Sequence, residues 1–237
     1  MQGPCLSVAS LLRALAIFVF LLCGTASSAW SDEFAALDRA IESTPNTPSL
    51  HQERGVLRFF AGRFEEAIAD FDRVVELLPS QEAYHWQRGI AHYYAGHYAD
   101  GVAQFELHQT VNSQDVENAV WHYLCKAKVD GLESAREHLI PIRRDTRTPM
   151  SQVWDLFAGT GSVKDVLEAA NLIGPSGEPS RQSQCYAHLY LGLYFEINGD
   201  EAKAAEHIAL AATTYSMNNY MGKVALVHAK FLGIEMK

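Results

Sequence analysis

The chain has 237 residues, of which 48% are hydrophobic and 20% are charged, and its formal net charge is −9. This composition is typical of a globular protein and excludes a disordered chain or a coiled coil. The acidic balance argues against nucleic acid and anionic membrane surfaces as partners, because both would repel the protein.

Residues 1–29 have the pattern of a secretory signal peptide. Arg13 precedes an apolar run at 14–23 that is too short to span a bilayer. Small residues then provide cleavage positions after Ala26 or Ala29. We therefore predict that the protein is exported, to a periplasm or to the outside of the cell.

Cys23 raises the question of a lipid anchor, because a cysteine followed by Gly24 can begin a lipoprotein. A lipoprotein cleavage site has a branched residue followed by two small ones, whereas bulky residues occupy positions 20–22. This difference argues against lipid anchoring through Cys23.

Beyond the signal peptide, the chain contains two cysteines, Cys125 and Cys185. A small secreted domain that depends on disulfides has four or more. The hydrophobic core must therefore supply the stability, and we expect two separate buried thiols. The sequence leaves open whether the two form a disulfide.

A 34-residue repeat organises the rest of the chain. HQERGVLRFFAGRFEEAIADF at 51–71 aligns with HWQRGIAHYYAGHYADGVAQF at 85–105, and HLYLGLYFEINGDEAKAAEHI at 188–208 is a third copy. Each copy predicts two helices around a glycine turn. The recurring small, aromatic and proline positions are Gly55, Gly62, Ala67, Phe71, Pro79, Gly89, Gly96, Phe105, Gly192, Gly199 and Ala204.

These positions resemble the tetratricopeptide repeat, a pair of antiparallel helices with a small residue in the first helix and a turn glycine. The resemblance implies an all-α solenoid of antiparallel helix pairs with a C-terminal capping helix, expected at about 217–233. We divide the chain into a signal peptide at 1–29, an N-terminal helix and linker at 30–47, two clear repeat units at 48–115, degenerate helical repeats at 116–173, a loop at 174–184, and a C-terminal repeat unit with the capping helix at 185–237.

The order of these parts resembles the NlpI-type periplasmic adaptor proteins of bacteria. WHYLCKAK at 121–128 and LGLYFEINGDEAKA at 191–204 contribute to the likeness, which covers about residues 48–233. The resemblance implies an often dimeric scaffold, anchored through a lipidated cysteine, that brings proteases and cell-wall hydrolases together. Because this chain lacks a good lipidation site, the resemblance supports an adaptor function for it more strongly than it supports a membrane-anchored localisation.

In such repeats the first helix of each pair lines the concave face, where peptides bind. The predicted groove residues are Gln52, Val56, Phe59, Phe60, Trp86, Ile90, Tyr93 and Tyr94. Their rings can supply binding hot spots. An equally weighted alternative is that several are packed between helices or covered by the C-terminal helix.

Histidines in the repeats suggest a metal site, but the spacing argues against it. His51, His85 and His188 share one repeat position and would lie about 10 Å apart on stacked helices, too far to share a zinc ion. His92 and His97 can approach each other across a turn, but no third ligand is evident. We therefore predict no metal and no cofactor.

Arg54 and Arg88 directly precede the close-packed glycines of the first two repeats. A guanidinium group at such a position needs a carboxylate partner. We expect each arginine to pair with an acidic residue such as Asp70, Asp72 or Asp100.

No pattern in the chain indicates catalysis. The GTGS at 159–162 lacks the length and the lysine of a phosphate-binding loop. His122 and His188 each lie three residues from a cysteine, which is a common accident on a helix. We predict a non-catalytic exported adaptor that binds protein partners, among them proteases, peptidoglycan hydrolases or a second copy of itself. The alternatives are a structural assembly subunit and an enzyme that uses Cys125 or Cys185.

Overall fold

The computed structural model describes residues 31–174 and 177–235. The predicted signal peptide and Cys23 lie outside these residues. Within them, no helix has both the length and the apolar composition that crossing a membrane requires.

The described residues form helices joined by turns, and between them the only β-type pairing is an isolated bridge from Ile173 to Pro179. A helix at 31–43 comes first. It is followed by α2 (Pro48–Phe60), α3 (Phe64–Leu77), the 3-10 helix η1 (Pro79–Tyr84), α4 (Trp86–Ala95), α5 (Tyr98–Gln109), α6 (Val116–Glu137), α7 (Met150–Ala158), α8 (Val163–Ala170), α9 (Arg181–Ile197), α10 (Glu201–Ala212) and α11 (Tyr220–Phe231). The predicted all-α class is confirmed for this part of the chain.

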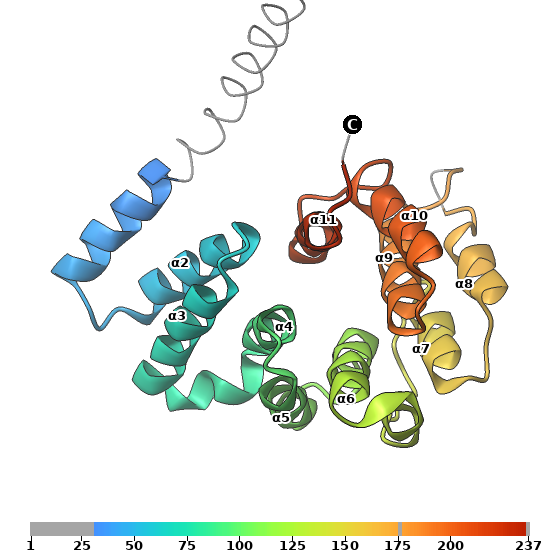
Figure 1. Cartoon of the computed structure of the whole chain (residues 1–237), viewed down its shortest axis with the longest axis horizontal. Helices are drawn as coiled ribbons and strands as arrows, with labels where there is room; N and C mark the ends of the chain where they lie inside the picture. The colour runs from blue at the N-terminus through green and yellow to red at the C-terminus, as the bar shows by residue number, and fades with distance from the viewer. Residues whose placement is uncertain (1–30, 175–176, 236–237) are drawn as a thin grey trace, which may run out of the picture.

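Consecutive helices pack side by side around an arc that runs from α2 to α10 (Figure 1). The predicted turn glycines Gly62, Gly96 and Gly199 follow the first helix of their pairs with φ near +80° (79°, 81° and 82°). Glycine adopts this left-handed backbone conformation without the steric cost that a Cβ imposes. Each turn therefore reverses the chain and starts the second helix.

The predicted glycines inside the first helices allow close approach of the second helices. A Cβ atom on Gly55 would lie 2.6 Å from Phe71 Cε1, and one on Gly89 would lie 2.7 Å from Phe105 Cζ. In the third copy a Cβ on Gly192 would lie 2.5 Å from Ile208 Cδ1. The same contact thus recurs in all three pairs, and the second helices also bury Ala67 and Ala204.

Ion pairs stabilise the first two pairs, as the sequence predicts. Arg54 donates to both carboxylate oxygens of Asp70, from Nε to Oδ2 at 3.0 Å and from Nη2 to Oδ1 at 2.6 Å. It also donates to Asp38 at 2.6 Å. Arg88 donates to Asp72 at 2.6 Å. Asp70 is almost completely buried, so these bonds satisfy a carboxylate that would otherwise be costly to bury.

The middle of the chain is less regular. Gly131 interrupts α6 with φ 87° and ψ 168°, which separates a long first segment from a short second one. The loop predicted at 174–184 is shorter than expected, because α9 begins at Arg181 and Ser180 caps its first turn by accepting from the Ser183 N–H.

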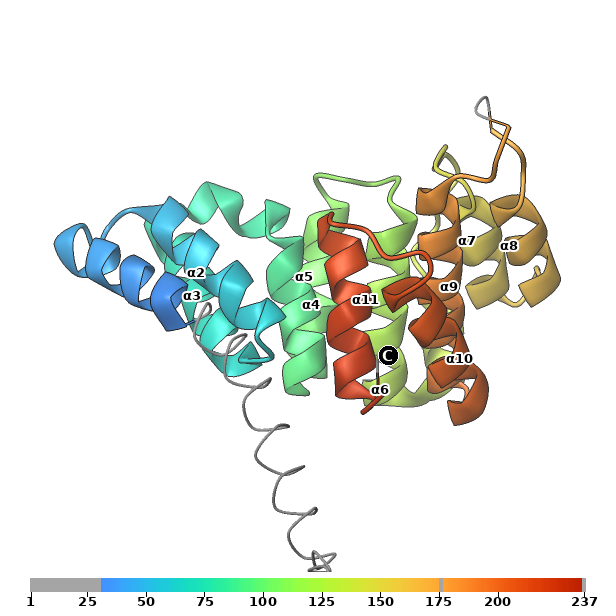
Figure 2. The same cartoon turned by 90° about the horizontal axis from the view of Figure 1, so that it is seen from above.

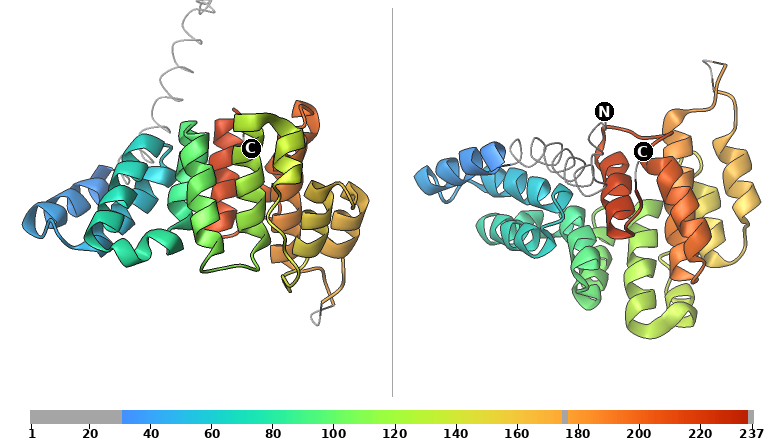
Figure 3. Two further views of the ribbon diagram at one scale, coloured as in Figure 1. Left: turned by 90° about the horizontal axis from the view of Figure 1, so that it is seen from below. Right: turned by 45° about the horizontal axis from the view of Figure 1, so that its top comes forward.

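The C-terminal helix α11 falls within the predicted range 217–233 and packs on α10, the helix before it. It occupies the inner side of the arc, between α2 on one side and α9 and α10 on the other (Figures 1 and 2), and Figure 3 shows this arrangement from two further sides. The physical reason is that apolar or buried positions follow one another around α11, at 221, 222, 224, 225 and 227–229. A helix with buried residues on more than one face needs neighbours on more than one side.

We predict that Gly192→Ala destabilises the protein by roughly 1–3 kcal/mol, because the added methyl group overlaps Ile208 and the gain in helix propensity is smaller. Urea unfolding followed by circular dichroism measures the change. The double variant with Ile208→Ala should lose less stability than the sum of the losses in the two single variants, because the shorter side chain makes room for the methyl group. Strict additivity would contradict the close contact.

Candidate functional site

Helix α11 covers most of the predicted aromatic groove. Phe59, Phe60, Ile90, Tyr93 and Tyr94, five of the eight predicted residues, have exposed fractions of 0 to 9%. Burial at this level means that they form part of the core between the arc and α11. An open groove over all eight residues is therefore absent, and the interpretation in which the C-terminal helix covers these rings describes the structure.

Two residues of α11 make the main contacts with these rings. Tyr220 lies 5.0 Å from Phe60 and 4.7 Å from Trp86 between ring centroids. The Tyr94 hydroxyl and His228 Nδ1 are hydrogen bonded at 3.0 Å in a buried setting. Edge-to-face aromatic contacts and a buried hydrogen bond favour one position of α11.

A cavity of about 310 Å³ remains open at the N-terminal end of α11. The helices α4, α5, α6 and α9 and the start of α11 surround it. Two predicted groove residues, Trp86 and Ile90, line it. The other half-buried predictions, Gln52 and Val56, line two separate hollows. The sequence thus identified one wall of the cavity.

Three polar atoms of residues around this cavity are buried without a hydrogen-bond partner in the described part of the chain. They are Trp121 Nε1, the Tyr220 hydroxyl and Asn118 Oδ1. The Asn118 amide nitrogen, in contrast, donates to the Phe105 carbonyl at 3.1 Å. Buried polar groups in proteins are nearly always paired, because leaving one unpaired costs about 1–3 kcal/mol. The residues that line the cavity thus carry two donors and one acceptor that the described part of the chain leaves unpaired.

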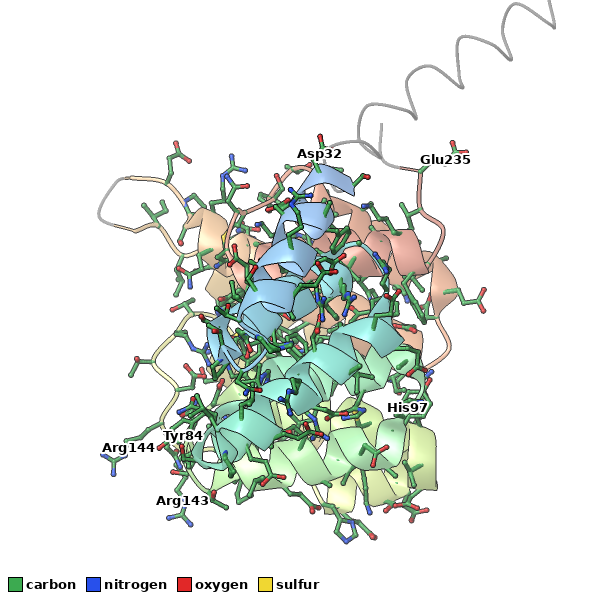
Figure 4. The ribbon with its side chains drawn as sticks, turned by 90° about the vertical axis from the view of Figure 1, so that its left-hand side faces the viewer. Asp32, Tyr84, His97, Arg143, Arg144 and Glu235 are labelled. Carbon is green, nitrogen blue, oxygen red and sulfur yellow. The ribbon has the colours of Figure 1, made fainter. Side chains whose placement is uncertain are left out.

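One wall of the cavity is charged. Arg147 forms ion pairs with Asp115 at 2.5 Å, with Asp145 at 2.6 Å and with Glu117. One guanidinium group thus pairs with three carboxylates, so its positive charge is not available to a ligand. The neighbouring Arg143 and Arg144 extend away from the ribbon near Tyr84 (Figure 4).

Glu117 has the most unusual electrostatic environment in this wall. Burial raises its pKa from an ordinary value of 4.5 to about 7; the charge of Arg147 opposes this shift and the charge of Asp115 adds to it. The Tyr190 hydroxyl donates to Glu117 Oε2 at 2.8 Å. Because the pKa lies near neutrality, Glu117 exchanges a proton over the physiological pH range.

The histidines near the cysteines have other partners. His122 Nε2 lies 3.4 Å from Glu106 Oε1, and His188 Nδ1 is hydrogen bonded to His207 Nδ1 at 2.8 Å. Cys125 and Cys185 are both buried free thiols, as predicted. Burial raises the pKa of Cys185 to about 11 and raises that of Cys125 further. Neither thiol has the exposure or the thiolate character of a nucleophile.

One group of side chains could hold a metal ion. Ligand atoms of His92, His97 and Asp100 all lie within 4.8 Å of one another. Asp100 is a third candidate ligand that the sequence analysis did not identify, because its proximity to the two histidines depends on how α5 begins. The three histidines that share a repeat position, His51, His85 and His188, do not take part in this group.

No protein-family model matches the chain, and no curated protein matches it significantly. The functional interpretation therefore depends on the geometry of the cavity and of the arc.

Sequence reasoning missed the residues that give the cavity its chemistry. Trp121 stands out in WHYLCKAK, but its free N–H follows from packing against Tyr93 and Tyr94 at 5.3 and 6.0 Å between centroids. Glu117 carries no signal in the sequence, because Tyr190 and Arg147 reach it from distant segments.

We predict that Glu117→Gln reduces the pH dependence of stability. A folded-state pKa above 4.5 means that Glu117 contributes its full stability below pH 4.5 and loses it as the pH rises through about 7. Between pH 4.5 and 8, the free energy of unfolding of the native chain should fall by roughly 3 kcal/mol relative to that of the variant. Urea unfolding across this range tests it, with the exposed Glu133→Gln as control. A constant difference between native chain and variant would contradict the raised pKa.

We also predict that iodoacetamide at pH 8 labels neither Cys125 nor Cys185 in the folded chain, because both thiols are buried and protonated. Peptide mapping by mass spectrometry measures each site separately, and labelling in denaturant provides the positive control. Rapid labelling of either cysteine under native conditions would contradict this structure and favour a catalytic thiol.

Proposed function

We propose that the protein is a non-catalytic adaptor of the tetratricopeptide-repeat type, which binds an extended segment of a partner protein in the cavity beside α11. The observation that carries this proposal is the set of unpartnered polar atoms of Trp121, Tyr220 and Asn118 around the cavity that Trp86 borders. The recurring glycine contacts of the helix pairs support the repeat assignment.

A polypeptide segment fits the chemistry of the cavity. Its carbonyl groups accept hydrogen bonds from Trp121 Nε1 and the Tyr220 hydroxyl, and its N–H groups donate to Asn118 Oδ1. Its side chains bury apolar surface against the rings of Trp86 and Tyr186. A small anion fits less well, because Arg147 is already neutralised by three carboxylates.

The resemblance to NlpI-type adaptors supplies the class of partner. It suggests a protease or a peptidoglycan hydrolase in the periplasm, and the signal-like residues 1–29 are consistent with export. An adaptor acts by holding one partner near another, which raises the effective concentration of each for the other. The site then needs affinity and no reactive group.

A structural assembly subunit is the second candidate function, and one observation favours it. Leu172 and Ile173, which follow the C-cap of α8, are adjacent large apolar residues with exposed fractions of 66 and 74%. Such a pair is suited to an interface with a second copy or with a larger complex. Sedimentation velocity that shows association at micromolar concentration, lost in Leu172→Ala, would favour this function.

We predict that Tyr220→Phe lowers the affinity for the partner without destabilising the fold. The change removes only a hydroxyl that has no partner in the free protein. A partner carbonyl would then lose its donor, which weakens binding by about tenfold. To find the partner, the full chain is immobilised and exposed to an extract of its own compartment, and the retained proteins are identified by mass spectrometry. The affinity is then measured by titrating a retained protein against the native chain and against Tyr220→Phe.

Tyr94→Phe is the matched control, because its hydroxyl is hydrogen bonded inside the protein to His228. This variant should lower the melting temperature and leave the affinity unchanged. Alanine at Tyr93 or Tyr94 is unsuited to the test, since both rings belong to the core. Equal affinity for the native chain and Tyr220→Phe would contradict binding in this cavity.

A further inference from the structure

The second repeat carries a cluster of side chains at the turn between α4 and α5. His92 lies in the last turn of α4, His97 is the N-cap of α5, and Asp100 lies in the first turn of α5. Glu65, at the start of α3, approaches His97 with its Oε1 at 3.3 Å from His97 Nε2. Figure 4 shows His97 at the edge of the molecule opposite Tyr84, Arg143 and Arg144.

The turn brings the two histidines together. Gly96 has φ +81°, and the His97 N–H donates to the His92 carbonyl at 2.9 Å, which closes the chain back over the end of α4. The two rings lie 5.8 Å apart between centroids. Asp100 is one helical turn beyond His97 and therefore lies on the same side of α5.

The preceding repeat shows what these three positions do elsewhere in the chain. Arg58, Arg63 and Glu66 lie one 34-residue period before His92, His97 and Asp100. There, both arginines pair with the carboxylate: Arg58 Nη2 lies 3.7 Å from Glu66 Oε2, and Arg63 donates to both Glu66 oxygens. The fold thus directs two basic side chains and one acid to a single point. In the second repeat, the two permanent positive charges are replaced by imidazoles.

His92 has no partner that explains its position. It is 4% exposed, and both ring nitrogens are buried without a hydrogen bond from any described residue. Its counterpart Arg58, in contrast, donates to Asp70 at 2.6 Å. Burial lowers the pKa of His92 to about 4, with the charge of Arg88 acting in the same direction, so the imidazole is neutral and can act as a ligand.

Among the described residues, the other charged groups near His92 do not occupy the ring nitrogens of His92 or the carboxylate of Asp100. Arg88 is occupied by Asp72 at 2.6 Å and by Gln104 at 2.9 Å. His97 and Glu65 are partly exposed, with side-chain fractions of 42 and 67%, so both can adjust their rotamers. Asp100 is likewise exposed.

We propose that His92, His97 and Asp100 bind one divalent transition-metal ion, for which Zn²⁺ is the best match, with Glu65 as the fourth ligand. Imidazole nitrogens with carboxylate oxygens are a donor set that zinc accepts, whereas calcium and magnesium prefer oxygen alone. Two neutral imidazoles and two carboxylates balance a charge of +2. The ion supplies the positive charge that the arginines supply in the first repeat.

The geometry permits this ligation with small movements. In a tetrahedral zinc site with bonds near 2 Å, ligand atoms lie roughly 3.3 Å apart. The three candidate ligand atoms lie within 4.8 Å of one another, and the exposed side chains of His97 and Asp100 can close the remaining distance. The bound ion would join α3, α4 and α5, and so clamp the first repeat to the second.

The test is a calorimetric titration of ZnCl₂ into the full chain, prepared without a histidine tag, together with the visible spectrum of the Co²⁺ form. We expect one site per chain and an intense tetrahedral Co²⁺ absorption. His97→Ala and Asp100→Asn should each weaken binding by at least about tenfold and abolish that absorption. Both positions are exposed, so the variants should keep the fold, which circular dichroism checks.

His138→Ala is the matched control, because His138 is an exposed histidine in a different part of the chain and belongs to no such cluster among the described residues. It should bind Zn²⁺ as the native chain does. Zn²⁺ should also raise the melting temperature of the native chain and of this control, but not of His97→Ala. The proposal is overturned if the native chain binds no Zn²⁺ at micromolar concentration, or if His97→Ala and Asp100→Asn bind it as tightly as the control.

Discussion

The close approach of helices at the repeat glycines determines the rest of this structure. At Gly55 and Gly89 the aromatic ring of the second helix lies where a side chain would otherwise stand. Hydrophobic burial at this contact outweighs the roughly 1 kcal/mol that glycine costs inside a helix. Because the same contact recurs in α2 and α3, in α4 and α5, and in α9 and α10, these three pairs share one packing geometry within the arc of Figure 1.

The arc creates a concave face that this chain fills itself. Helix α11 packs on the rings that the sequence predicted as a binding groove, and Tyr220 and His228 anchor it there. The aromatic positions thus serve stability first. The cavity at the edge of α11, where we propose that a partner binds, combines the half-buried ring of Trp86 with residues whose polar atoms the fold leaves unpaired.

Among the unsatisfied polar groups of the described residues, two sets lie beside a candidate site, and each set has a distinct chemistry. Trp121 Nε1 and the Tyr220 hydroxyl are donors, which suit a peptide. His92 has two ring nitrogens without partners beside a carboxylate, which suit a metal ion. Arg147, in contrast, pairs with three carboxylates, so its positive charge is not available to a ligand.

The sequence by itself determined the helix pairs and their turn glycines, because these depend on local periodicity. It also indicated that Arg54 and Arg88 each need a carboxylate, with Asp70 and Asp72 among the candidates, because these contacts lie within a repeat or between neighbouring repeats. It also identified Trp86 as a wall of the candidate site. Only the tertiary structure decided where α11 docks, that Glu117 is buried against Tyr190, and that Asp100 completes a cluster with two histidines. The position of α11 and the burial of Glu117 depend on contacts between segments that are distant in the chain. The position of Asp100 depends on the orientation of the first turn of a helix. A repeating pattern of apolar residues specifies neither kind of contact.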